Sequence, residues 1–100
     1  MADFDHEWTE QVCIPATHPS LAGHFPDQPV VAGVILLDRL AASLERNGHG
    51  MLQRISAVKF RAPLLPDQAA ELHVAISAAQ IRFRVTRGDE LLATGDGELA

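Results

Sequence analysis

An α+β fold is predicted for this chain, with one long helix packed against an antiparallel sheet of about five strands. Only the segment near residues 32–47 has helical periodicity, whereas residues 52–99 alternate apolar and polar side chains. A proline-rich segment, residues 15–29, separates the helix from a single earlier strand. The length of 100 residues is enough for one core, so we expect a single domain over residues 1–100.

The first strand is expected at residues 8–14, which mix β-formers with polar side chains and end at Pro15. Residues 15–29 contain four of the six prolines and cannot form regular structure. They are expected to form a long ordered loop, and loops of this length in compact domains are usually functional.

The helix is predicted over residues 32–47, because good helix formers fill it and Asn47-Gly48 supplies a stop. One broad apolar side is expected to seat on the sheet, a narrow polar stripe follows, and a second apolar side carries a carboxylate. The sheet-facing side is formed by Leu36, Leu37, Leu40 and Leu44. The polar stripe is formed by Arg39, Ser43 and Arg46. The second apolar side is formed by Val34, Ile35, Ala41 and Ala42, with Asp38 among them.

Four strands are expected after the helix. Residues 52–61 and 72–76 have strand character, and residues 81–86 show the clearest alternation in the chain. The sequence Arg-Gly-Asp-Glu at residues 87–90 predicts a hairpin turn before a last strand at 91–99. Short connections make the last strands antiparallel neighbours. A single long, mostly apolar helix embraced by such a sheet is the hot-dog arrangement.

Composition argues against several classes of protein. The chain is 47% hydrophobic and 21% charged, which is typical of folded rather than disordered proteins. No segment approaches the roughly 20 apolar residues of a membrane span. The net charge of −5 argues against nucleic-acid binding. The acidic N-terminus is unlike a secretory signal, and the single cysteine, Cys13, fits a reducing compartment, so we expect a cytoplasmic protein.

Basic residues are concentrated in one part of the chain. Residues 54–87 hold six of the eight Lys and Arg side chains, opposed there only by Asp67 and Glu71. This distribution predicts either a surface for an acidic partner or a solvated strand face. Arg82 and Arg84 are the candidates for docking such a partner.

Three candidate catalytic groups fall within residues 23–38, G-H-F-P-D-Q-P-V-V-A-G-V-I-L-L-D. His24 is expected in a proline-stiffened loop, where its imidazole can be held at a fixed orientation for acid–base chemistry. Gly33 lies at the expected helix N-terminus, where free N–H groups favour negative charge. Asp38 lies within an apolar helix, where an unpaired charge is costly. Together these groups suit proton removal beside a thioester carbonyl and loss of a hydroxyl.

Each of these residues also has an ordinary structural interpretation. A lone loop histidine is most often solvated or structural. Asp38 would pair with Arg39 or Arg46, and Gly33 would be a site of close packing.

The same window resembles the active-site segment of the bacterial 3-hydroxyacyl-[acyl-carrier-protein] dehydratases. That family is marked by G-H-F-P-G-x-P-x-x-P-G-x and by an acidic residue fourteen positions after the histidine, the spacing of His24 and Asp38. Residues 59–63, K-F-R-A-P, followed by Pro66-Asp67, resemble the family's K-F-R-x-P…P-G-D segment. The resemblance spans roughly residues 15–99.

The resemblance implies a hot-dog dehydratase that converts 3-hydroxyacyl thioesters to trans-2-enoyl thioesters in fatty acid, related lipid or polyene biosynthesis. It implies that His24 acts at C2 of the acyl chain, that Asp38 handles the departing hydroxyl, and that the Gly33 amide polarises the thioester carbonyl. It assigns Phe25 and Val30 to the substrate site.

The resemblance also implies the partners of the chain. The thioester substrate is carried by acyl carrier protein or coenzyme A. The active sites lie at the interface of a homodimer, with His24 from one subunit and Asp38 from the other. No cofactor is expected, and the spacing of Cys13, His18 and His24 is unlike a compact zinc site, so no metal is expected either.

Two departures from the family pattern keep other functions open. Asp27 replaces the glycine after G-H-F-P, and Ala32 replaces the proline before the helix glycine. These changes motivate one alternative, an acyl-binding or scaffolding domain without turnover. An acyl thioesterase is a further alternative, motivated only by fold analogy.

Overall fold

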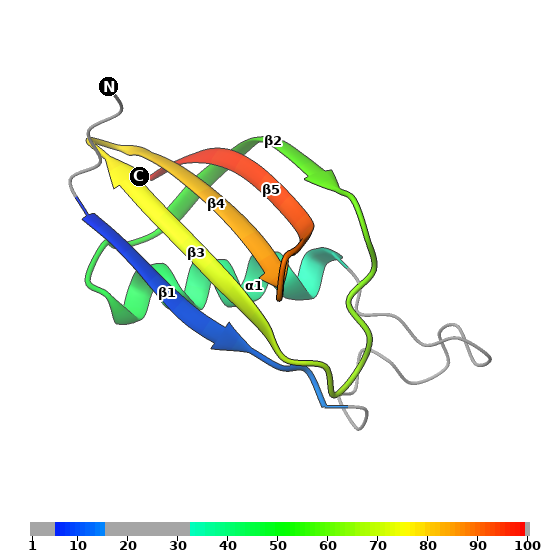
Figure 1. Ribbon diagram of the computed structural model, residues 1–100. Coiled ribbons are helices and arrows are strands. Elements are labelled where there is room, and N and C mark those ends of the chain that lie inside the picture. Colours follow the sequence, from blue (N-terminus) through cyan, green and yellow to red (C-terminus); the bar gives the residue numbers. More distant parts are fainter. Residues whose placement is uncertain (1–5, 16–32, 100) are drawn as a thin grey trace.

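The computed structural model describes residues 6–15 and 33–99 (Figure 1). Every predicted helix and strand is present, with bounds that differ from those predicted by at most two residues, whereas the loop predicted over residues 15–29 lies outside the described residues except for Pro15. In chain order the elements are β1 (His6–Val12), α1 (Gly33–Arg46), β2 (Leu52–Phe60), β3 (Ala70–Ser77), β4 (Gln80–Arg87) and β5 (Glu90–Leu99).

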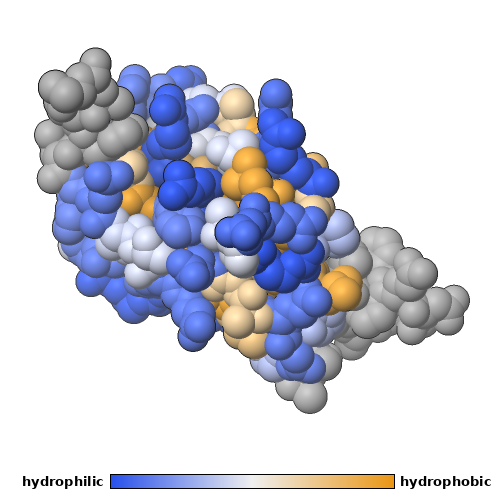
Figure 2. Space-filling model, viewed as in Figure 1, coloured by the Kyte–Doolittle hydropathy of each residue, from blue (hydrophilic) through white to orange (hydrophobic). Residues whose placement is uncertain are grey.

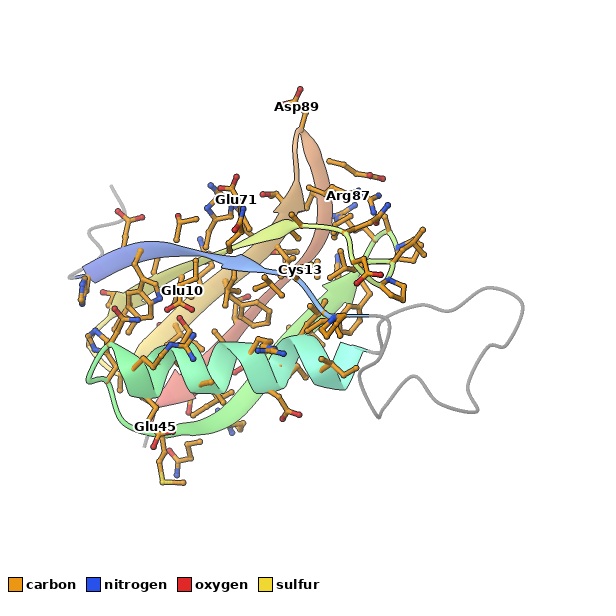
Figure 3. The ribbon with its side chains drawn as sticks, turned by 90° about the horizontal axis from the view of Figure 1, so that it is seen from below. Glu10, Cys13, Glu45, Glu71, Arg87 and Asp89 are labelled. Atoms are coloured by element: carbon orange, nitrogen blue, oxygen red, sulfur yellow. The ribbon has the colours of Figure 1, made fainter. Side chains whose placement is uncertain are left out.

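The strands form one antiparallel sheet in the order β1-β3-β4-β5-β2. Helix α1 lies along one face of this sheet, and the sheet curves around it (Figures 1 and 3). The predicted hot-dog arrangement is therefore confirmed.

The core lies between α1 and the inner face of the sheet. On β4, Ile81, Phe83 and Val85 are buried, whereas Arg82 and Arg84 alternate with them and are exposed. On α1, the predicted sheet-facing residues Leu36, Leu40 and Leu44 are buried, and Leu37 packs against the core from its edge. Burying apolar side chains of this size stabilises the fold by about 1.5–3 kcal/mol each.

The opposite face of the sheet is largely hydrophilic (Figure 2), as its alternation predicts. Glu71 points to this face, while Glu45 lies on the far side of α1 (Figure 3). Within the described residues, no helix is long and apolar enough to cross a membrane.

The helix ends as predicted at Asn47-Gly48. The N–H of Gly48 donates to the carbonyl of Glu45 at 3.1 Å, and the N–H of His49 donates to the carbonyl of Leu44 at 2.9 Å. These two bonds form a Schellman motif, and Gly48 has the positive φ of 77° that this motif requires.

Ser43 belongs to the predicted polar stripe of α1, and its side chain is fully buried, with 0% exposure. The indole N–H of Trp8 donates to its Oγ at 2.7 Å, so the hydroxyl has a partner and can be buried without an unsatisfied group. The other two residues of the polar stripe, Arg39 and Arg46, are exposed.

Two glycines of β5 allow its close pairing with β2. A Cβ on Gly95 would lie 2.6 Å from the Phe83 ring and 2.7 Å from the Ala57 carbonyl oxygen, and one on Gly97 would lie 2.5 Å from the Arg54 carbonyl oxygen. The β2–β5 register also shifts twice along β2. Such irregularities bend and twist a strand, and they lie where the sheet curves around the helix.

Candidate active site

The N-terminus of α1 is the first part of the candidate site. The helix begins at Gly33, and its first turn carries no acidic side chain. The first N–H groups of a helix lack intrahelical partners and carry the positive end of the helix dipole. With no carboxylate in this turn to offset that dipole, the amide of Gly33 can stabilise a developing oxyanion.

Gly33 also has the close contact that its structural interpretation predicts. A Cβ at this position would lie 2.4 Å from Cζ of Phe60, at the end of β2. Any other residue at this position would therefore have to displace the Phe60 ring. Close packing and stabilisation of an oxyanion are compatible roles for Gly33, because the ring of Phe60 faces its Cα whereas the proposed chemistry uses its N–H.

Asp38 is exposed on α1, on the second apolar side of the helix. Among the described residues it has no ion-pair partner, and Arg46, one of its predicted partners, binds Glu10 instead. Ala41 and Ala42 are half-buried, but Ile35 is buried in the chain's own core cluster with Ile14. Fewer residues than predicted therefore remain uncovered on the second apolar side, because Ile35 in the first turn of the helix belongs to the core.

The other predicted site residues, His24, Phe25 and Val30, lie outside the described residues, as do Asp27 and Ala32. The structure therefore places Gly33 and Asp38 on one helix and leaves their relation to His24 as a prediction.

Both alternatives for the basic segment find support in the structure. Arg82 pairs with Asp96 at 3.1 Å, and Arg54 pairs with Glu98 at 2.7 Å, as expected for a solvated strand face. Arg84 is exposed and has no carboxylate partner among the described residues. Arg82 and Arg84 line an open depression of about 520 Å³ on the outer face of the sheet, together with His73.

An aromatic cluster near the end of α1 was missed by the sequence analysis. The rings of Trp8 and His49 stack with centroids 5.2 Å apart, and Nδ1 of His6 lies 2.6 Å from Nε2 of His49. Periodicity carries no signal for such contacts, because β1 and the α1–β2 turn are far apart in the sequence. No group of three or more metal-ligating side chains occurs within residues 6–15 and 33–99.

Comparison with known proteins identifies the family. The model of the ApeI-like family, described as ApeI dehydratase, matches residues 2–96. The 3-hydroxyacyl-[acyl-carrier-protein] dehydratase FabZ of Haemophilus influenzae (strain PittEE) is 30% identical over 105 residues, covering 94% of this chain and 69% of the relative. FabZ of Bartonella bacilliformis is 34% identical over 71 residues, covering 61% of this chain and 46% of the relative.

Solved structures agree with this assignment. A chain of the dehydratase heterocomplex ApeI:P from Xenorhabdus doucetiae superimposes with a TM-score of 0.83 at 26% identity, covering 93% of this chain and 86% of that one. A point mutant of the fluoroacetyl-CoA-specific thioesterase FlK gives a TM-score of 0.60 at 13% identity, covering 98% of this chain and 86% of that one. The second likeness shows the shared fold alone.

The fold is that of a hot-dog domain, and the family match makes it one of the dehydratase type. This chain belongs to the ApeI-like dehydratase family.

Proposed function

We propose that this chain dehydrates 3-hydroxyacyl thioesters, carried by acyl carrier protein, to trans-2-enoyl thioesters. The observation that carries the proposal is the family match over residues 2–96, which includes the window from Gly23 to Asp38. The presence of Gly33 and Asp38 on one helix supports it further.

The proposed chemistry assigns one role to each group. The imidazole of His24 removes a proton from C2, while the N–H of Gly33 stabilises the charge that develops on the thioester oxygen. Asp38 gives a proton to the hydroxyl on C3, which departs as water as the C2–C3 double bond forms. Transfer of the proton from His24 to Asp38 restores the enzyme. Phe25 and Val30 are proposed to line the acyl site, and no cofactor is needed.

We propose that the active site is completed in a homodimer. Asp38 is exposed in the single chain, where a catalytic carboxylate would be surrounded by water. The outer edge of β2 offers a pairing surface, because Met51 and Phe60 beside it are 76% and 50% exposed. At the opposite edge, Glu10 of β1 is instead ion-paired with Arg46 of α1.

We propose that Arg82 and Arg84 contribute to docking of the acidic carrier. We also propose that residues 1–100 form a single domain and that the protein works in the cytoplasm. Arg84 supports docking more strongly, since Arg82 already pairs with Asp96. Free coenzyme A thioesters are the alternative substrate.

The products of the reaction test the proposed activity. Purified protein is incubated with a 3-hydroxyacyl thioester, and enoyl thioester and free thiol are both measured. Dehydration yields the enoyl product without thiol, whereas hydrolysis would release thiol and contradict the proposal. Binding of the thioester without any turnover would favour an acyl-binding domain.

Charge reversal tests carrier docking. Arg84→Glu is expected to raise KM for carrier-bound substrate and to leave KM for a short thioester analogue unchanged, because the analogue makes no contact with the docking surface. The comparison is Arg84→Gln, which removes the charge without reversing it and is expected to raise KM for carrier-bound substrate by less than Arg84→Glu. Equal effects of Arg84→Glu on both substrates would contradict docking at this residue.

A further inference from the structure

The contact between Phe60 and Gly33 joins the end of β2 to the first residue of α1. An ideal Cβ at Gly33 would lie 2.4 Å from Cζ of Phe60 and 2.9 Å from each of its two Cε atoms. The tip of the ring therefore points at Gly33. It fills the space in which any other side chain at this position would begin.

The sheet fixes the backbone that carries this ring. Phe60 is paired with Ala93 of β5, and the N–H of the next residue, Arg61, donates to the carbonyl of Leu92 at 2.7 Å. The residue nevertheless remains 50% exposed. It thus joins a rigid strand end to the helix N-terminus and leaves one side open.

We infer that Phe60 is a positioning residue for the backbone N–H of Gly33. This inference rests on the proposed function, in which that N–H polarises the thioester carbonyl. The ring fixes the distance between β2 and the first turn of α1. It also covers this turn with apolar surface, and a hydrogen bond to a developing oxyanion is stronger where water is excluded.

Two substitutions separate positioning from simple apolar coverage. Phe60→Leu keeps an apolar side chain but loses the ring that reaches Gly33. Phe60→Tyr keeps the ring but adds a hydroxyl to Cζ, the atom that points at Gly33. Both variants are expected to lower kcat by roughly tenfold or more, because small displacements of catalytic groups have large effects on rate. KM for the acyl substrate is expected to stay near its wild-type value, and sedimentation is expected to show the wild-type assembly, because Phe60 also lies beside the edge proposed for dimer pairing.

The matched control is Leu65→Ala. Leu65 is an exposed apolar side chain, 38% exposed, that is not among the nearest contacts of Gly33. This variant is expected to keep the wild-type kcat. A side chain that only shields apolar surface would tolerate Phe60→Tyr equally well, so wild-type kcat in both Phe60 variants would overturn the inference.

Thermal unfolding tests the contact independently of catalysis. Gly33→Ala is expected to lower the Tm, because its Cβ clashes with the ring, and Gly33→Ala combined with Phe60→Leu is expected to recover most of that loss. Recovery of Tm without recovery of kcat supports positioning, whereas additive losses of Tm would show that the ring is not the obstacle. If the wild type shows no dehydration, the proposed function fails, while this cycle still reports whether the contact exists.

Discussion

The hydrogen bond between Trp8 and Ser43 shows how a side chain distant in the sequence sets the environment of a helical serine. Ser43 lies between Arg39 and Arg46 in helical spacing, which predicts a polar stripe but does not predict which of its members is buried. Its burial depends on a tryptophan 35 positions earlier, whose N–H needs an acceptor once the ring packs against the core. Local pattern cannot predict this contact.

Removal of the Ser43 hydroxyl is expected to destabilise the fold. Ser43→Ala leaves the indole N–H of Trp8 without its partner, at a cost of about 1–3 kcal/mol in the free energy of unfolding. Urea unfolding measures this cost. Ser77→Ala, at a partly exposed site on β3, is the control and is expected to change the free energy by less than about 0.5 kcal/mol. Equal values for the two variants would show that the bond contributes nothing.

The pairing of β5 with β2 depends on glycines that leave no room for a side chain. Gly97→Ala would bring Cβ to 2.5 Å from the Arg54 carbonyl oxygen, which belongs to the backbone and cannot rotate away. We expect the Tm to fall by several degrees, since 1 kcal/mol corresponds to about 4–8 °C in a domain of this size.

The control for Gly97→Ala is Gly88→Asn in the β4–β5 turn. Gly88 has a φ of 61° with open space around its Cα, and asparagine tolerates this conformation. A Tm for Gly97→Ala as high as that of Gly88→Asn would contradict the close β2–β5 packing.

The elements of this fold were predictable because each has a strong local signal. Each signal is contained in the segment that it predicts. Examples are the alternation in β4, the helix stop at Asn47-Gly48 and the turn at residues 87–90. Short connections predicted that the last strands are antiparallel neighbours, as β3, β4 and β5 are, but the positions of β1 and β2 were not predicted, because the β2–β5 pair joins segments about forty residues apart. For the site, position on α1 was predictable for Gly33 and Asp38, whereas the Phe60 contact with Gly33 depends on that long-range pairing.

At the scale of the whole molecule, the proposal of a shared active site makes an unusual prediction. His24→Ala and Asp38→Ala variants are each expected to be inactive. A mixture, unfolded and refolded together, is expected to regain about a quarter of wild-type activity, because half of the dimers are mixed and each restores one of two sites.

The control for this mixture is each variant refolded alone. The size of the assembly is measured in parallel by sedimentation. No recovery in a mixture that contains mixed dimers would contradict a site shared between subunits. Since the related ApeI chain belongs to a heterocomplex, a purified chain that stays monomeric would point to a different partner subunit.

The most direct test of the central claim is a spectroscopic assay of enoyl-thioester hydration and of the reverse dehydration. Wild type is compared with His24→Ala and Asp38→Ala. The account predicts turnover by the wild type and losses of about a hundredfold or more in both variants, as expected for removed acid–base groups. Turnover at the wild-type rate in either variant would contradict the assigned pair, and an inert wild type across chain lengths and carriers would contradict dehydration itself.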